Sequence, residues 1–447
     1  MRSDAVLTWT LCMVSACASA PRPPAQPLPT VRHRPPSADY AGHLHLREAG
    51  DPSAPALLLV HGLGERASAD FSPVIPALAQ HYRVVALDLP GFGASPAAGH
   101  SFHPSDDAEL VARVAAELAE RQHRPIFLLG HSMGGVVAAL VAGRHPELVD
   151  RLVLVDAAGI LHREAYAASQ FIDPLRGRRG TSVPVGLMHT MLAAGRAMEP
   201  DPEAIVASPR LRRVLLGDDP NKIAALSLIV TDVGPALSAI RAPTLLVWGA
   251  RDRIAPLRNA RVLQSRIAHA RLVVLPEAGH VPMTDAPQRL VERIRAHLDD
   301  APVPPQPARP SHGDFRCEDQ DGAVLEGDYG HVRLERCEGV VLRDGTLESL
   351  TLVDSEATLE NVRVHARQGP ALRSENSVLR MDGGALVGEV AMQLDRSRLD
   401  LAGVTLTGRA HAILVDGAPT RALFSACVVQ DAGVTIHAHG NVALARP

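Results

Sequence analysis

Short apolar segments alternate with amphipathic ones between residues 40 and 298. Each apolar segment is four or five residues long and rich in aliphatic side chains, which is typical of strands buried on both faces of a sheet. The segments are Ala56–Val60, Arg83–Leu87, Ile126–Leu129, Leu152–Val155, Thr244–Val247 and Leu272–Leu275, and His43–Leu46 is expected as an outer strand. Strands that alternate with helices predict a mostly parallel, doubly wound α/β sheet with helices on both faces.

Two segments between these strands have helical periodicity. The first lies between Ser105 and Gln122, with Ser105 as its expected N-cap. Its apolar residues recur three and four positions apart, as on one face of a helix: Leu110, Val111, Val114 and Leu118. The second is expected over Gly135–Ala142. The alternation stops between about 160 and 239, where methionines and leucines (Met188, Met191, Leu192, Met198) occur among glycines and prolines, and we expect a helical cap there.

A different pattern follows the helix expected to end near residue 299. Residues 300–314 are rich in proline, which cannot continue a helix, so we expect a linker between a domain at 39–299 and another at 315–447. In the second domain a serine or threonine is followed by alternate apolar residues, a small or turn-forming residue and a further apolar residue. Four copies align, with starts 22, 20 and 23 residues apart: Ser355–Val364, Ser377–Leu386, Ser397–Leu406 and Thr420–Val429. This period predicts an all-β domain built as a parallel β-helix, with an antiparallel β-sandwich as the alternative.

The N-terminus has the features of a targeting segment. Met1 and Arg2 precede an apolar run, Ala5–Val14, and small residues surround Cys17. The residues Val14-Ser15-Ala16-Cys17 resemble the bacterial lipobox, which implies a signal peptide at 1–17, lipidation of Cys17 and a proline-rich tether at 18–38. We therefore expect a protein of the bacterial cell envelope, lipid-anchored on the outer-membrane or periplasmic side. Asp4 weakens the positive charge of the leader, and a secreted or merely anchored chain is the alternative.

Composition narrows the function classes. A formal charge of -4 gives no electrostatic reason to expect nucleic-acid binding, and aromatic residues, at 3%, are few for base stacking.

Removal of Cys12 with the signal peptide and acylation of Cys17 would leave Cys317, Cys337 and Cys427. An oxidising compartment would permit a Cys317–Cys337 bridge, although spacing alone does not establish the pairing.

Candidate chemistry is concentrated at one strand-to-helix junction. Gly130-His131-Ser132-Met133-Gly134 follows an expected strand and opens an expected helix. In that context a G-x-S-x-G pattern forms a strained elbow that lifts the serine hydroxyl above the sheet, and the glycines allow neighbouring backbone to approach. Ser132 is therefore the candidate nucleophile, and an ordinary glycine-rich turn is the alternative.

A serine hydroxyl needs a base that accepts its proton during attack. His280, in Gly279-His280-Val281-Pro282, follows the last expected strand at the carboxyl edge of the sheet and is the candidate. The base needs a carboxylate to orient it, and Asp252 follows the Thr244–Val247 strand. Asp156, directly after the Leu152–Val155 strand, is the competing acid.

These motifs support a family resemblance over roughly residues 40–298. Gly130 to Gly135 resembles the nucleophile motif of α/β-hydrolase esterases and carbon–carbon bond hydrolases, and His61-Gly62-Leu63-Gly64 and Asp88 to Ser95 are similar to loops of the same family. The resemblance implies an α/β-hydrolase fold with a helical cap and a triad in the chain order Ser132, Asp252, His280. It also implies an oxyanion hole from the backbone N–H groups of Leu63 and Met133. The supporting motif residues are His61, Gly62, Gly64, Gly130, His131 and Gly134, and His131 is expected to line the elbow without acting as the base.

The expected reaction is cofactor-free hydrolysis of a carboxylic ester through an acyl-enzyme on Ser132. Carbon–carbon bond hydrolysis and perhydrolysis by the same triad are alternatives, whereas dehalogenases and epoxide hydrolases attack with a carboxylate that the elbow lacks. No motif implies a nucleotide, zinc or another metal. The apolar cap favours an apolar acyl substrate, although the same residues would also suit a packed core. An alternative of another class is a cell-surface protein whose C-terminal repeats bind a glycan or a protein partner.

Overall fold

The computed structural model describes residues 30–33, 40–171, 201–300 and 309–446. The predicted signal peptide with Cys17, nearly all of the tether, residues 172–200 of the predicted cap with its methionines, and most of the linker lie outside these residues. Two compact units share the chain: a mixed α/β unit, which takes the residues up to 301 except 160–165 and 261–268, and a second unit, which contains these two segments and the C-terminal part of the chain. Each unit is described by itself.

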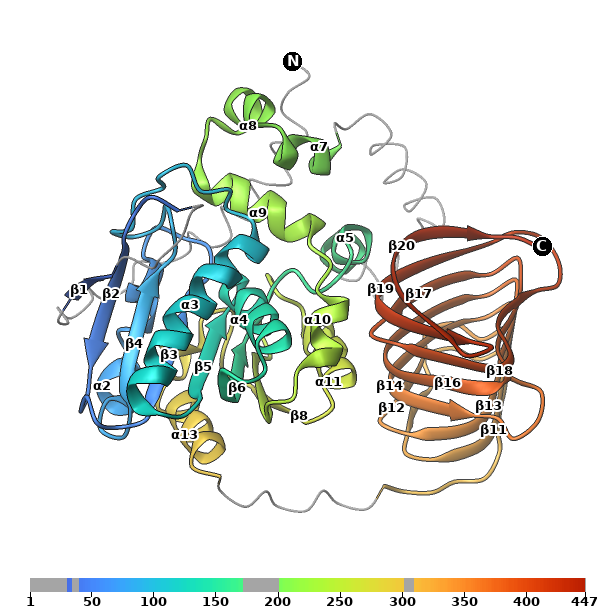
Figure 1. The fold of residues 1–447 in the computed structure, drawn as a ribbon. Helices are drawn as coiled ribbons and strands as arrows, with labels where there is room; N and C mark the ends of the chain where they lie inside the picture. Colours follow the sequence, from blue (N-terminus) through green and yellow to red (C-terminus); the bar gives the residue numbers. More distant parts are fainter. Residues whose placement is uncertain (1–29, 34–39, 172–200, 301–308, 447) are drawn as a thin grey trace. The chain divides into compact units, whose positions relative to one another are not determined.

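The first unit contains an eight-stranded sheet (Figure 1). Its strands are β1 (Thr30–His33), β2 (Leu44–Ala49), β3 (Ala56–Val60), β4 (Arg83–Asp88), β5 (Ile126–His131), β6 (Val149–Val155), β7 (Thr244–Gly249) and β8 (Ala270–Leu275). They lie in the order β1-β2-β4-β3-β5-β6-β7-β8, with β1, β2 and β4 paired antiparallel and all pairs from β4 to β8 parallel. The predicted mostly parallel sheet is confirmed.

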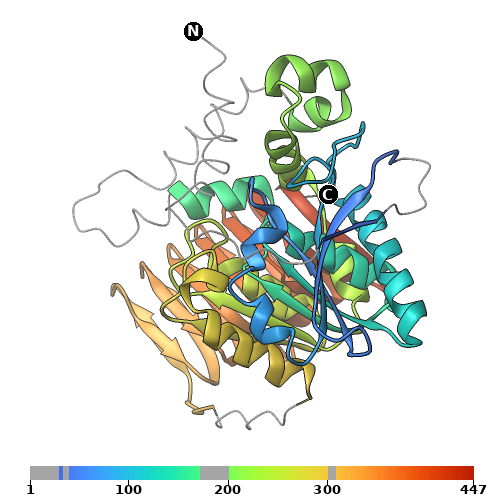
Figure 2. The same cartoon turned by 90° about the vertical axis from the view of Figure 1, so that its left-hand side faces the viewer.

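Helices cover both faces of this sheet (Figure 2). Helices α3 (Pro104–Gln122) and α4 (Met133–Arg144) contact β3 and β5, and α13 (Pro287–Leu298) contacts β6 and β7. Every residue of β3 is buried, because both of its faces are covered, and this explains its unbroken apolar sequence. The other helices are η1 (Ala67–Phe71), α2 (Ile75–Leu78), α11 (Leu257–Arg266) and α12 (Pro282–Asp285).

The predicted N-cap of α3 is wrong by two residues. His103 is the N-cap, and its ring Nδ1 accepts the N–H of Ser105 at 3.2 Å. Pro104 then occupies the first helical position, where its missing N–H costs nothing.

The described part of residues 160–239 is helical, with α5 (Arg163–Phe171), α7 (Pro202–Ala207), α8 (Pro209–Leu216), α9 (Pro220–Val230) and α10 (Gly234–Ala239). No helix within the described ranges is both long and apolar enough to span a membrane.

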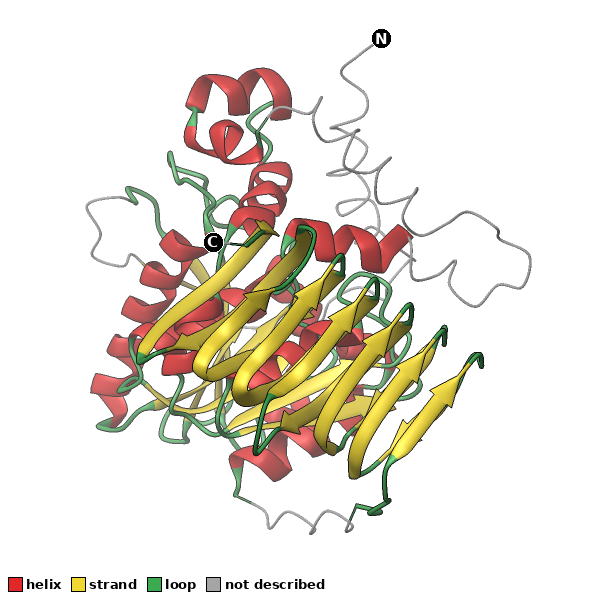
Figure 3. Ribbon diagram, turned by 90° about the vertical axis from the view of Figure 1, so that its right-hand side faces the viewer, coloured by secondary structure: helices red, strands yellow, loops and turns green. Residues whose placement is uncertain are grey.

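Residues 309–446 of the second unit are all-β, and Figure 3 shows their strands as successive yellow layers. The strands are β9 (Phe315–Glu318), β10 (Val324–Glu326), β11 (Tyr329–Glu335), β12 (Val340–Arg343), β13 (Thr346–Val353), β14 (Glu356–His365), β15 (Pro370–Glu375), β16 (Val378–Asp395), β17 (Arg398–Ala402), β18 (Thr405–Val415), β19 (Thr420–Asp431) and β20 (Val434–Leu444). Their pairings are parallel except that of β19 with β20. Equivalent residues of the aligned copies are partners in this register: Ala357 with Leu379, Leu379 with Leu399, and Leu399 with Ala422.

Two features of the repeat have clear physical causes. The small residue of each copy has a positive φ, at 54°, 72°, 66° and 49° for Asn361, Gly383, Gly403 and Ala426, so the chain bends there. The leading hydroxyl accepts a backbone N–H from the preceding copy: Ser377 from Ser355 at 3.0 Å, Ser397 from Ser377 at 3.4 Å, and Thr420 from Ser397 at 3.2 Å. The hydroxyls therefore satisfy backbone donors that would otherwise be buried without a partner. These parallel pairings favour the solenoid over the antiparallel alternative, and the β-helix assignment itself stays a prediction.

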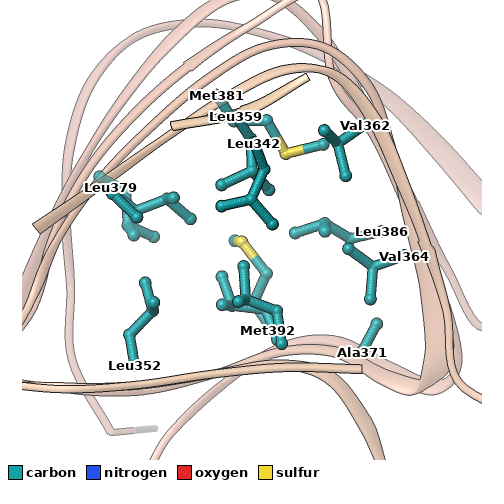
Figure 4. Packing of buried hydrophobic residues seen from close by; sticks show 14 of the residues in the cluster. Leu342, Leu352, Leu359, Val362, Val364, Ala371, Leu379, Met381, Leu386 and Met392 are labelled. Atoms are coloured by element: carbon teal, nitrogen blue, oxygen red, sulfur yellow. The ribbon is translucent and has the colours of Figure 1, made fainter. Parts of the chain in front are cut away.

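The alternate apolar residues of the repeat form the core of this unit. Figure 4 shows Leu359, Leu379 and Leu386 pointing into one apolar interior, with the sulfur-bearing side chains of Met381 and Met392 beside them. Cys317 and Cys337 form a disulfide, and Cys427 is a buried free thiol. The two cysteines are 20 residues apart, and the register partner of Cys317 is Leu334, so the bridge joins positions that are not paired in the strand ladder.

Candidate active site

Ser132 lies at the junction of β5 and α4, in a backbone conformation that few residues adopt. Its φ is +53° and its ψ is -121°, and the side chain is almost fully buried. The Ser132 N–H donates to Val155 O at 3.0 Å, and its carbonyl accepts the N–H groups of Gly135 and Ala158. A strained conformation persists only when its surroundings hold it, and these three hydrogen bonds do so.

The two glycines of the motif permit this junction to be tight. A Cβ on Gly130 would lie 2.1 Å from the carbonyl oxygen of Gly134, and a Cβ on Gly134 would lie 2.2 Å from that of Val60. Any side chain at either position would push the start of α4 away from the strands. The sequence motif therefore reflects a packing requirement of the turn.

His280 and Asp252 meet Ser132 at the carboxyl edge of the sheet. His280 lies between β8 and α12, and its Nε2 is 3.0 Å from Ser132 Oγ. Its Nδ1 is 2.8 Å from Asp252 Oδ2. The structure thus brings together all three residues of the candidate triad, with both ring nitrogens of His280 engaged.

Asp252 is held in place by its own loop. Its Oδ1 accepts the N–H groups of Ile254 at 2.7 Å and Ala255 at 3.0 Å, which leaves Oδ2 for His280. Burial acts to raise the pKa of Asp252, but the hydrogen bond and charge of His280 and the further hydrogen bonds outweigh it, so the pKa is lowered. Asp252 is therefore a carboxylate at neutral pH, which can stabilise a protonated imidazole.

The loop after β3 lies against Ser132. A Cβ on Gly62 would be 2.6 Å from Ser132 Cβ, which places the His61-Gly62-Leu63-Gly64 segment directly beside the hydroxyl. His61 is fully buried; its Nδ1 donates to Gly62 O at 2.6 Å and its Nε2 accepts the N–H of Leu89 at 3.0 Å. Burial lowers the pKa of His61, so this ring is neutral and serves to shape the loop.

Three contacts at this site were not predicted from the sequence. Gly64 N–H donates to Asn221 Oδ1 of α9 at 2.9 Å, although the two residues are 157 positions apart. His131 Nε2 donates to the carbonyl oxygen of His280 at 2.7 Å, so His131 ties the His280 loop to the elbow and is not the base. Asp285 Oδ2 accepts the N–H of Gly279 at 2.8 Å and holds the other side of the same loop. The only hint of these contacts in the sequence is that Gly279 and His280 lie in a short loop, which other groups must hold in position.

Asp156, the competing acid, takes a different place. Its Oδ1 accepts the N–H of Gly249 at 2.9 Å, and the carboxylate that faces His280 Nδ1 is that of Asp252. No group of three or more histidine, cysteine, aspartate or glutamate side chains within the described ranges is arranged to hold a metal ion. The arrangement offers an alcohol, a base and a buried carboxylate in series.

Comparison with known proteins identifies the family of this chain. A sequence profile of the alpha/beta hydrolase family matches residues 57–293, more than half of the chain. The chain belongs to the alpha/beta hydrolase family. The pimeloyl-(acyl-carrier protein) methyl ester esterase of Aeromonas hydrophila is 31% identical to this hydrolase over 252 residues, which cover 54% of this chain and 94% of the esterase.

Two further proteins are similar to this chain. The dihydrolipoyllysine-residue acetyltransferase component of the acetoin cleaving system of Pseudomonas putida is 31% identical over 285 residues, covering 59% of this chain and 69% of that protein. Among solved structures, a thermophilic esterase from Thermogutta terrifontis has a TM-score of 0.44 and 25% identity, covering 61% of this chain and 98% of the esterase. The predicted fold class is confirmed, and the homologues support a hydrolase.

Proposed function

We propose that this alpha/beta hydrolase cleaves carboxylic esters through an acyl-enzyme on Ser132, with His280 as base and Asp252 as its orienting acid. The observation that carries the proposal is the continuous contact from Ser132 Oγ to His280 Nε2 and from His280 Nδ1 to Asp252 Oδ2, at 3.0 and 2.8 Å. The name of the Aeromonas hydrophila relative, a methyl ester esterase, supports the ester class.

In the first half-reaction, Ser132 Oγ attacks the ester carbonyl carbon while His280 Nε2 takes the hydroxyl proton. The carbonyl π electrons move to oxygen, and the resulting oxyanion accepts hydrogen bonds from the N–H groups of Leu63 and Met133. Each such donor contributes about 3 kcal/mol to transition-state stabilisation. His280 then gives its proton to the leaving alkoxide as the carbon–oxygen bond breaks, so an alcohol leaves and Ser132 is acylated.

In the second half-reaction, a water molecule attacks the acyl carbon and His280 Nε2 takes one of its protons. Collapse of the second tetrahedral intermediate returns that proton to Ser132 Oγ and releases the carboxylic acid. The Asp252 carboxylate stabilises the imidazolium in both halves. The position of Met133 supports its role as an oxyanion donor. It is the first residue of α4, where backbone N–H groups lack intrahelical partners and the helix dipole is positive.

The test is labelling with a fluorophosphonate probe combined with hydrolysis of nitrophenyl acetate, butyrate and octanoate. We expect the wild type to be labelled and to turn over at least one ester, and Ser132→Ala to lose labelling and at least about 1,000-fold of turnover. Ser72→Ala is the matched control, because Ser72 is a buried serine of the same unit whose hydroxyl has no hydrogen-bond partner among the described residues.

The outcomes separate the parts of the proposal. Labelling of both the wild type and Ser132→Ala would refute the nucleophile. Labelling without ester turnover, together with cleavage of a 2-hydroxy-6-oxo-dienoate, would refute the ester assignment in favour of carbon–carbon bond hydrolysis. Equal rates on the three acyl lengths would refute the preference for an apolar acyl substrate that the cap sequence predicts.

A further inference from the structure

Asp156 is a fully buried acid beside the candidate triad for which the proposed reaction has no use. It is the first residue after β6, and its φ is +44°. Its N–H donates to Val247 O of β7 at 3.0 Å, and its Oδ1 accepts the N–H of Gly249, the last residue of β7, at 2.9 Å. The carboxyl group is therefore fixed at the start of the loop that carries Asp252.

The second oxygen of Asp156 has an unusual environment. Oδ2 is buried and accepts no N–H or O–H group from the described residues. The carboxyl group of Asp252 is the nearby acid that interacts with the Asp156 carboxyl group, and Oδ2 is the Asp156 oxygen that no backbone N–H occupies. A carboxylate can only accept, so two ionised carboxylates in such contact would repel each other and leave Oδ2 unsatisfied. A proton on one of the two carboxyl groups would remove the repulsion and give Oδ2 a hydrogen-bond partner.

The surroundings decide which of the two is protonated. Asp252 already accepts two backbone N–H groups and faces His280, and all three contacts favour its ionised form. Asp156 has the single N–H of Gly249, and the charged groups acting on it are the carboxylates of Asp252 and, from α12, Asp285. Burial, and then the charge of Asp252, raise the pKa of Asp156 well above its usual range.

We propose that Asp156 is a positioning residue whose neutral carboxyl group donates a hydrogen bond from Oδ2 to the Asp252 carboxylate at neutral pH. This bond would hold Asp252 in the rotamer that receives His280 Nδ1 and would spread its negative charge. The two acids at neighbouring strand ends are then partners with different protonation states. The inference rests on the proposed function, because positioning matters only if His280 is the working base.

The first experiment compares Asp156→Asn with Asp156→Ala. An asparagine is neutral and keeps a donor, whereas alanine removes it. We expect Asp156→Asn to keep kcat within about threefold of wild type and Asp156→Ala to lower kcat by about 10- to 100-fold with little change in KM, as for loss of a hydrogen bond to a charged group. The acid limb of kcat/KM, along which the base becomes protonated, should stay in place in Asp156→Asn, because a neutral group replaces a neutral group.

The same comparison can overturn the proposal. If Asp156 is ionised in the wild type, Asp156→Asn removes a negative charge near His280, and the acid limb moves to lower pH by about half a unit or more. A loss of kcat in Asp156→Asn as large as in Asp156→Ala would equally refute it. Asp156→Asn and the wild type are sufficient for these outcomes if Asp156→Ala fails to fold.

A second measurement does not depend on activity. In protein labelled with carbon-13 at the aspartate carboxyl carbons, the wild type should show one resonance that is at the protonated position at pH 7 and is absent from Asp156→Asn. The inference would be overturned if the resonance assigned to Asp156 is already at the ionised position at pH 5. If the wild type is not labelled by fluorophosphonate, the proposed function fails, and this resonance still decides the protonation state of Asp156.

Discussion

His297 provides a quantitative test of the packing beneath the catalytic sheet. It lies on α13 with 8% of its surface exposed, and its Nε2 has no hydrogen-bond partner among the described residues. Burial, and then the positive charges of Arg151 and Arg271, lower the pKa of His297 from 6.5 to about 4. The ring is therefore neutral in the folded protein over a range in which the unfolded chain would be protonated.

The sign and size of the effect follow from this difference in pKa. A depressed folded-state pKa means that the unfolded state binds the proton first as the pH falls. The contribution of neutral His297 to the free energy of unfolding is therefore fully present above pH 6.5 and is lost as the pH falls through 4. A shift of 2.5 units, from 6.5 to about 4, corresponds to a loss of about 3 kcal/mol, because each unit is worth about 1.4 kcal/mol.

The assay is urea unfolding of the wild type and His297→Gln at pH 7.5 and at pH 4. Trp248 is fully buried in β7 of the same unit, so its fluorescence reports the unfolding of that unit. Both proteins should carry Trp9→Phe, which removes the other tryptophan. Carboxylate titration cancels in the comparison, and we expect the wild type to lose about 3 kcal/mol more than His297→Gln. An equal loss in both proteins would show that His297 is solvated, and the reasoning would be wrong.

Substitutions at three positions test the active-site geometry. Asp252→Asn should lower kcat by about 10,000-fold with the fold retained, and a loss below about tenfold would place the orienting acid elsewhere. In Gly62→Ala the new methyl carbon would lie 2.6 Å from Ser132 Cβ, so labelling by fluorophosphonate should slow at least about tenfold; an unchanged rate would mean that the loop yields freely. Asn221→Ala removes the acceptor for Gly64 N–H and should reduce kcat about fivefold to tenfold while KM changes little. Asn221→Asp should restore much of this loss, and equal activity of the alanine variant and wild type would exclude a positioning role.

The parts of the fold that the sequence predicted correctly are those governed by local pattern and burial. β3 and β7 are buried along their whole lengths, so β3 is visible as an unbroken apolar run and β7 as an apolar run over Leu245–Trp248. The start of α3 was mispredicted because a histidine can supply a capping nitrogen as Ser105 would supply an oxygen. Pro104 at the first helical position was the better indicator of that boundary.

The acids at the site illustrate what a single sequence leaves open. Asp156 and Asp252 both follow parallel strands and so both reach the carboxyl edge of the sheet, and no local pattern separates their roles. The difference arises from the loop of Asp252, which turns back so that its own N–H groups at Ile254 and Ala255 hold the carboxylate. Likewise, the contact of Gly64 with Asn221 depends on how α9 folds over the loop, which no spacing in the sequence encodes.

One hydrogen-bonding pattern of the sheet accounts for the placement of the candidate nucleophile and of both acids. In each of three successive strands, the first residue beyond the strand donates its N–H to a carbonyl of the next strand in the sheet: Ser132 to Val155, Asp156 to Val247, and Ala250 to Leu275. These bonds, at 3.0, 3.0 and 2.9 Å, continue the parallel ladder into the loops. Because the elbow and both acid loops are tied to the same register, a slip of β6 by one residue would displace Ser132 and Asp156 together. Strand pairing therefore fixes the positions of the loops that carry these residues.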